Sequence, residues 1–319
     1  VGLSIGLCCI GPSDHSEINC EVDHFSTKVA WIWSDVGPTP SKIDSDWRRR
    51  LDGPCHCIDA DRPKTSLFLD RKYRVSMAPP PNMDDGVARS IAAFESGNPV
   101  MIFDSDFRER ETDLLWPATA ATPEVIRRLR KDCGGLLFLA IGDEIGEMFG
   151  LPWLQDIHSH DALVGENPVL EHLVTNDLQY DSRSAFTLSL NHRETYTGIT
   201  DRDRALTTRR FGELSRELIR EEAKGDSALY ELGKEFRTPG HIPVCRESPG
   251  GLKTRQGHTE LAVSIARLAG LVPCTIGAEM LEPDGDGALS LDGAREYAAS
   301  HGIPMITGEQ ISAAFDEKD

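Results

Sequence analysis

A short polar stretch, residues 255–260, holds four side chains that can do chemistry. It reads Arg-Gln-Gly-His-Thr-Glu, which places a guanidinium, an imidazole, a hydroxyl and a carboxylate side by side. Leu261, Ile265 and Leu268 follow at the spacing of one buried helix face. We therefore expect the stretch at the start of a helix of residues 258–269. Free N–H groups and the helix dipole favour an anion such as a phosphate there. A solvated, capped helix start is the alternative interpretation.

A second dense group of charges occupies residues 104–113, directly after a short apolar strand predicted at 99–103. It contains Arg108, Glu109, Arg110, Glu111 and Asp113. Carboxylates held at the end of a buried strand suit a divalent cation and proton transfer. An ordinary solvated loop is the alternative.

Three further polar segments are candidates for substrate contacts. Residues 197–200 read Thr-Gly-Ile-Thr and precede two arginines, which suits a phosphate-contacting loop, although Thr200 or Asp201 also suits the cap of a helix over 202–223. Residues 239–241, Pro-Gly-His, predict a turn that places His241 at the start of a strand. Glu279 lies at the end of an apolar strand predicted over 273–280.

The composition excludes several classes of protein. The 319 residues carry a formal charge of −18, which opposes general binding to nucleic acids or anionic membranes. A phosphorylated substrate would then need a local basic pocket. No apolar run approaches the roughly 18 residues of a membrane span, and residues 1–10 lack a basic segment typical of signal peptides. We expect a cytoplasmic protein whose eight cysteines are reduced thiols.

The chain divides at residues 78–81, Ala-Pro-Pro-Pro, into an extension of residues 1–82 and a regular domain of residues 83–319. The extension holds Cys55, His56 and Cys57, whose spacing matches no usual zinc pattern, so idle thiols are favoured over a metal. In the domain, strands alternate with helices, which indicates a layered α/β or α+β architecture. The predicted helices lie at 84–96, 122–131, 202–223, 258–269, 291–300 and 308–315. The predicted strands lie at 99–103, 135–141, 185–190, 273–280 and 303–306.

Taken in order, these segments resemble the 3,4-dihydroxy-2-butanone 4-phosphate synthase family over about residues 83–317. Residues 108–113 are similar to its R-E-x-E-x-D element, 197–200 to its T-G-I-S/T loop, 239–241 to its P-G-H turn and 255–260 to its R-x-G-H-T-E signature. Glu279 matches its late glutamate. Residues 191–193, Asn-His-Arg, are most similar to the archaeal-type branch. Several motifs in one order make a chance similarity improbable.

The resemblance implies a mixed sheet flanked by helices and a homodimer with its active site near the subunit interface. It implies a lyase of riboflavin biosynthesis that depends on Mg²⁺ or Mn²⁺ and converts D-ribulose 5-phosphate to 3,4-dihydroxy-2-butanone 4-phosphate and formate. The implied metal ligands are Glu109 and His258. The implied catalytic residues are Glu111, Asp113, Glu279 and His241, the last also a candidate for the phosphate. The implied substrate-binding residues are Arg108, Thr197, Thr200, Arg255 and Thr259.

Two positions depart from the family pattern. Phe138 occupies the place of a cysteine, unless the strand is shifted by one residue and Phe138 points into the core. Arg110 replaces a small or amide residue. These departures and the extension of residues 1–82 favour an alternative, a paralogue acting on ribulose 5-phosphate or another sugar phosphate in a specialised pathway. A non-catalytic sugar-phosphate binder is a third hypothesis, which the intact acidic residues oppose. A dinucleotide-binding enzyme is not indicated, because no G-x-G-x-x-G follows a strand.

Overall fold

The computed structural model describes residues 85–173, 177–179 and 181–316. The predicted extension, its Cys55-His56-Cys57 motif and the proline-rich boundary at 78–81 lie outside the described residues. No helix in the described part of the chain is both long and apolar enough to cross a bilayer.

A mixed six-stranded sheet forms the centre of the domain, in the order β6-β3-β7-β2-β1-β8. Antiparallel pairing joins β1 to β2, β2 to β7 and β7 to β3, whereas β8 and β6 run parallel to β1 and β3 at the two edges. Its strands are β1 (Val100–Phe103), β2 (Thr112–Pro117), β3 (Phe138–Ile141), β6 (Val244–Arg246), β7 (Cys274–Glu279) and β8 (Met305–Thr307). A second, two-stranded sheet pairs β4 (Leu190–His192) with β5 (Phe236–Ile242).

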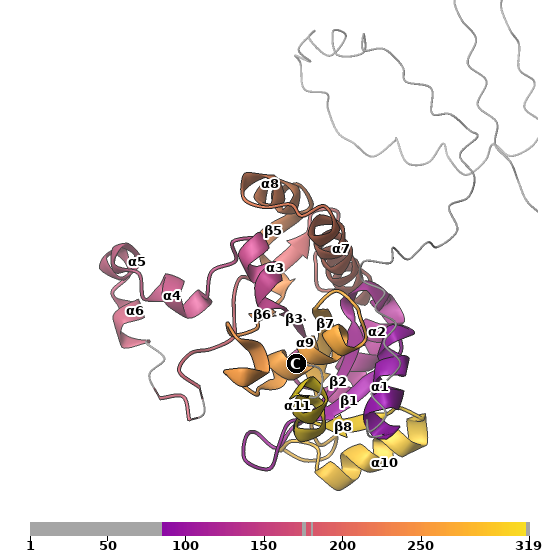
Figure 1. Ribbon diagram of the computed structural model, residues 1–319. Coiled ribbons are helices and arrows are strands. Elements are labelled where there is room, and N and C mark those ends of the chain that lie inside the picture. The colour runs from indigo at the N-terminus through magenta and orange to yellow at the C-terminus, as the bar shows by residue number, and fades with distance from the viewer. Residues whose placement is uncertain (1–84, 174–176, 180, 317–319) are drawn as a thin grey trace, which may run out of the picture. The chain divides into compact units, whose positions relative to one another are not determined.

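Helices cover both faces of the large sheet. The long helices are α1 (Asp85–Glu95), α7 (Asp201–Arg220), α8 (Asp226–Glu235), α9 (His258–Leu268), α10 (Leu291–His301) and α11 (Gly308–Asp316). The shorter ones are η2 (Ala118–Ala120), α2 (Pro123–Arg128), η3 (Leu129–Cys133), α3 (Asp143–Met148), α4 (Leu154–His158), α5 (Asp161–Glu166), α6 (Val169–His172) and η4 (Gly251–Lys253). Figure 1 shows α9 and α11 in front of the strands, and the short helices α4 to α6 at the left.

The alternation of side chains along β2 separates two cores. Leu114 and Trp116 join a cluster with α2, α3 and α7, whereas Leu115 joins a cluster with α1, α9 and α11. Successive side chains of a strand point to opposite faces, so Asp113 lies on the same face as Leu115, beneath α9. The predicted mixed sheet flanked by helices is confirmed.

Three local predictions were wrong. The strand predicted at 185–190 is reduced to an isolated bridge at Phe186 and the start of β4. Residues 239–241 lie inside β5 and do not form a turn before it. The strand predicted from residue 135 begins at Phe138. The strand β2 was missed, because its first two residues belong to the charged segment and its last is a proline.

The close approach of β5 to β4 leaves no room for a side chain at Gly240. A Cβ atom there would lie 1.9 Å from the backbone carbonyl carbon of Leu190 and 2.3 Å from the nitrogen of Asn191. We predict that Gly240→Ala lowers the free energy of unfolding by about 1–3 kcal/mol or more, because backbone must move. Denaturant unfolding measures this.

Gly233→Ala is the control, since Gly233 lies in α8 with nothing within 4 Å of an added Cβ atom. Alanine there should stabilise the helix by up to about 1 kcal/mol. Equal stability changes in the two variants would contradict the assigned packing of β4 on β5.

Candidate active site

The candidate site begins where β1 ends. Asp104 follows β1 and its side chain is fully buried. Its two carboxylate oxygens accept hydrogen bonds from the backbone N–H groups of Glu109 (2.9 Å) and Glu111 (3.0 Å). Asp104 therefore folds the charged segment back on itself and fixes the direction of Glu109. Asp104 was not among the site residues expected from the sequence, although its place directly after a buried strand is a signal for such a role.

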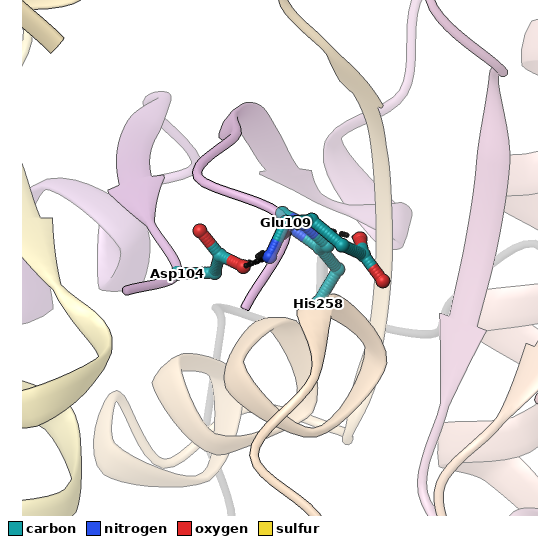
Figure 2. A group of neighbouring side chains, drawn as sticks. All are labelled: Asp104, Glu109 and His258. Atoms are coloured by element: carbon teal, nitrogen blue, oxygen red, sulfur yellow. Dashed lines mark hydrogen bonds and ion pairs between the residues drawn. The ribbon is translucent and has the colours of Figure 1, made fainter. Parts of the chain in front are cut away.

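His258 is the first residue of α9 and faces three carboxylates. Its Nδ1 lies 2.8 Å from Asp113 Oδ2, and its Nε2 lies 3.0 Å from Glu109 Oε2 and 3.8 Å from Asp104 Oδ2. Figure 2 shows Asp104, Glu109 and His258 together, with the Asp104 carboxylate beside the backbone nitrogen of Glu109. The structure thus brings the two expected metal ligands, Glu109 and His258, into contact and adds Asp104 to them.

The donor atoms of this group fit a divalent cation. One oxygen each from Asp104 and Glu109 and one nitrogen of His258 all lie within 4.8 Å of one another. The Nε2 atom of His258 is buried and lies 3.0 Å from Glu109 Oε2, but it makes no well-aligned hydrogen bond with the described residues. Its lone pair can therefore bind a cation when the imidazole is neutral. Two carboxylates and an imidazole suit Mn²⁺ well, and Mg²⁺ through the oxygens.

The carboxylates around His258 favour its protonated form when no cation is bound. Burial lowers the pKa of His258, but the negative charges of Asp113 and Glu109 outweigh it and hold this pKa well above the ordinary value. The contact with His258 lowers the pKa of Glu109 against the opposing effect of its partial burial. A cation beside Nε2 would take the place of the proton that these carboxylates attract.

Glu279 ends β7 directly opposite Asp113 in the antiparallel pair β2–β7. Burial and the negative charge of Asp113 raise the pKa of Glu279 to about 7. Burial also raises the pKa of Glu111, and the neighbouring carboxylates add to this while His258 opposes it. Carboxyl groups with raised pKa values can both give and take protons near neutral pH.

Two arginines flank this acidic group. Arg108 precedes Glu109, and Arg255 precedes α9. Both donate to Asp181, and Arg255 also pairs with Glu260, which is fully buried. Asp181 was not expected from the sequence, because it lies in a stretch without clear periodicity. Thr259 is buried in the first turn of α9, beside His258.

The remaining expected site residues form a second group. The His241 ring lies 3.0 Å from the side-chain nitrogen of Asn191, and Gly198 packs against the same amide. Thr197 donates to Asp203, and Thr200 caps α7 by accepting from the Asp203 N–H group. The side chains of Thr197, Thr200 and His241 are exposed.

The two groups lie apart in one chain. Thr200 begins α7, which covers the face of the sheet opposite to α9 and His258. His241 lies just before the edge strand β6, which is three inter-strand steps from β2 and Asp113. Steps of about 4.8 Å separate these strands by roughly 14 Å. The structure therefore does not bring Thr197, Thr200 and His241 to the carboxylates of the same chain.

Phe138 is buried on the α9 face of the sheet, 3% exposed, in the cluster that contains Leu115. It pairs with Gly277, two residues before Glu279. Its ring therefore lies in the core, as one alternative anticipated, but on the same face as the carboxylates and one row away from them. Arg110 is exposed beside Asp106, 3.7 Å away.

The chain is similar to known proteins in sequence and in fold. The family model for 3,4-dihydroxy-2-butanone 4-phosphate synthase matches residues 88–314. The enzyme of that name from Methanosarcina mazei is 38% identical over 234 residues, which cover 73% of this chain and 92% of the relative. The one from Archaeoglobus fulgidus is 40% identical over 224 residues, covering 70% of this chain and 90% of the relative.

A crystal structure of a 3,4-dihydroxy-2-butanone 4-phosphate synthase in complex with two magnesium ions aligns with a TM-score of 0.56 at 26% identity. The alignment covers 73% of this chain and 98% of that one. The family model alone spans well over half of the sequence, and the two archaeal relatives are 38% and 40% identical to the chain over their alignments. This chain belongs to the 3,4-dihydroxy-2-butanone 4-phosphate synthase family of enzymes.

Proposed function

We propose that the protein converts D-ribulose 5-phosphate to 3,4-dihydroxy-2-butanone 4-phosphate and formate, and so serves riboflavin biosynthesis. The observation that carries the proposal is the cluster of Asp104, Glu109 and His258 beside Asp113 and Glu279. A divalent cation held by Glu109 and His258 would act as a Lewis acid on neighbouring carbonyl and hydroxyl oxygens of the sugar. We further propose that the enzyme works in the cytoplasm.

The carboxyl groups around the cation are proposed to move protons. Glu279, with its pKa raised to about 7, can take a proton from a sugar carbon and return it to an oxygen. Glu111, whose pKa is also raised, is the second candidate for this exchange. Asp113 accepts a hydrogen bond from His258 Nδ1, which turns Nε2 toward Glu109 and the expected position of the cation.

The substrate phosphate is assigned to the arginine side of the site. Arg255 lies beside the N-terminus of α9, where free N–H groups and the helix dipole favour an anion. Arg108 contributes a second guanidinium, and Thr259 a hydroxyl in the first helical turn. In a chain of charge −18, these two guanidinium groups would give the phosphate local positive partners.

We infer that a homodimer completes the site. Thr197, Thr200 and His241 lie on the other face and edge of the sheet from His258, so they can reach a substrate at His258 only from a second copy. Exposed apolar side chains lie in the loops of both groups: Phe107 is 84% exposed, Tyr196 94% and Ile199 52%. Contact between two copies would bury such side chains.

A second candidate function is a paralogue that acts on ribulose 5-phosphate or another sugar phosphate in a specialised pathway. The bulk of Phe138, one row from Glu279 and Asp113, is the observation that favours it. Turnover of another sugar phosphate without formate release from ribulose 5-phosphate would favour the paralogue.

We predict that purified protein releases formate from ribulose 5-phosphate only with a divalent cation, and that chelation stops the reaction until Mg²⁺ or Mn²⁺ is restored. Glu109→Gln should weaken Mn²⁺ binding at least about tenfold, because one charged ligand is lost. Calorimetry measures the binding and a formate assay the turnover. Asp106→Asn, an exposed position of the same loop, is the control and should retain both. Turnover by Glu109→Gln in chelator would refute the metal assignment.

We predict that an inactive variant of the His258 group and an inactive variant of the His241 group recover activity when they form a mixed dimer. Glu109→Gln and His241→Asn proteins should each be inactive, whereas refolding them together should recover about a quarter of wild-type activity, because random pairing leaves one intact site in each hybrid dimer. Glu109→Gln mixed with His258→Asn is the control and should stay inactive, since both changes affect one group. Lack of recovery in the first mixture, with dimers present by light scattering, would contradict a shared site.

We predict that Glu279 makes stability fall as pH rises. Because its pKa is raised from 4.5 to about 7 in the folded state, the folded chain keeps a proton in this window that the unfolded chain has lost. The free energy of unfolding then falls as pH rises from the unfolded-state pKa of 4.5 through the folded-state pKa of about 7. The loss is about 1.4 kcal/mol for each pKa unit that separates the two states. Glu279→Gln in chelator should therefore gain stability relative to wild type between about pH 5 and about pH 8.

Denaturant unfolding at both pH values tests this prediction. Glu282→Gln removes an exposed carboxyl group just beyond β7 and should change stability by no more than about 0.5 kcal/mol at either pH. A constant difference between Glu279→Gln and wild type across the range would show that Glu279 does not carry the raised pKa.

A further inference from the structure

Asp181 lies between the two arginines of the candidate site. Its Oδ2 accepts from Arg255 Nη2 at 2.7 Å and from Arg108 Nη2 at 3.3 Å. The three side chains are only 14–15% exposed. The N–H groups of two guanidinium groups that converge on one anion match the oxygen positions of a carboxylate and of a phosphate. Here the anion is supplied by the chain itself.

The residues that follow Asp181 are anchored. The guanidinium of Arg183 lies 3.9 Å from the centre of the Trp153 ring, and Arg183 pairs with Asp156 at 3.5 Å. The Ser184 N–H group donates to the Gln155 side chain at 3.1 Å. The contacts of Arg183 thus fix the backbone two residues after Asp181. The Asp181 carboxylate can still move away from the arginines by rotation of its own side chain.

Space for this rotation exists beside the arginines. A cavity of about 390 Å³ adjoins Asp181 and Arg255 and is lined mainly by polar side chains, among them Ser248 and Thr254. The Nε atom of Arg255 is buried and makes no hydrogen bond with the described residues. A phosphate has more acceptor oxygens than a carboxylate, so it can use a donor that Asp181 leaves unused.

The charges of the group show which anion can replace Asp181. Arg255 is already paired with Glu260 at 2.5 Å, and the charges of both arginines also lower the pKa of Glu109. When Asp181 turns away, both guanidinium groups lose the carboxylate that they share. Competition with Asp181 lowers the affinity of every incoming anion by the same factor. A phosphate dianion, attracted more strongly than a singly charged carboxylate, stays bound despite this loss.

We propose that Asp181 occupies the phosphate subsite between Arg108 and Arg255 as an internal competitor and thereby sets which anions can bind. The inference rests on the proposed function, because it takes the two arginines as the phosphate subsite. Asp181 therefore sets a threshold of affinity: a phosphate dianion displaces it, whereas the single carboxylate of a sugar acid does not.

The experiment compares inorganic phosphate binding, measured by calorimetry without turnover, in wild type and Asp181→Asn. Removing the competing charge should tighten phosphate binding about tenfold or more. Acetate, which wild type should not bind measurably, should bind to the variant. Glu166→Gln, which removes an exposed carboxylate at the C-terminal end of α5, is the control and should bind phosphate as wild type does.

A double variant tests whether Arg255 transmits the effect. In an Arg255→Gln background, Asp181→Asn should raise the phosphate affinity by a clearly smaller factor than it does in wild type, because Asp181 and phosphate compete for Arg255. Thermal unfolding of each variant verifies the fold. Unchanged or weaker phosphate binding by a folded Asp181→Asn protein overturns the proposal and makes Asp181 a residue that positions the arginines.

The result is separable from the proposed reaction. If wild type forms no formate yet Asp181→Asn binds phosphate more tightly, the subsite inference stands and the proposed reaction fails. If formate forms and phosphate binding does not respond to Asp181→Asn, the reaction stands and the inference fails. If both assays respond as expected, the Michaelis constant for ribulose 5-phosphate should fall in Asp181→Asn as the phosphate dissociation constant does.

Discussion

The repulsion between carboxylates that surround one imidazole is the constraint on which the site depends. Asp104, Glu109 and Asp113 all approach His258, and Glu279 lies opposite Asp113. Such charges stay ionised together only when a positive charge lies among them. A protonated His258 meets this need when no cation is bound, and a divalent cation meets it better. The sheet order, with β2 between β1 and β7, is what forces these residues together.

The covering of both sheet faces has a consequence for assembly. A central sheet with helices on each side buries its strands well, but it also separates side chains that begin helices on opposite faces. His258 begins α9 on one face and Thr200 caps α7 on the other. One chain therefore presents two partial polar groups on different sides of the sheet. In the proposed homodimer, an isologous interface would bring the two complementary groups together twice.

Two partly buried arginines of the described residues are each paired with two carboxylates. Arg255 contacts Asp181 and Glu260, and Arg267 contacts Glu247 and Glu144. An unpaired buried guanidinium would be costly, so a binding site for anions built from arginines needs an internal partner when no ligand is present. Asp181 meets this need at the candidate site. The same contact that stabilises the empty site then opposes every ligand, which links stability to selectivity.

The sequence by itself determined the local features of this protein. The helical periodicity predicted α1, α7, α9 and α10 close to their bounds, because one buried face recurs every three or four residues. The motif residues Glu109, His258 and Glu279 were named because their types and order carry the family resemblance, and the structure places these three near Asp113 at one end of the interior strands. The tertiary structure alone decided the rest. Asp181 meets Arg255 across 74 residues of chain, and β2 exists because β1 and β7 supply its hydrogen bonds. Which residues share a face likewise depends on strand order, since contacts between distant segments leave no periodic pattern in the sequence.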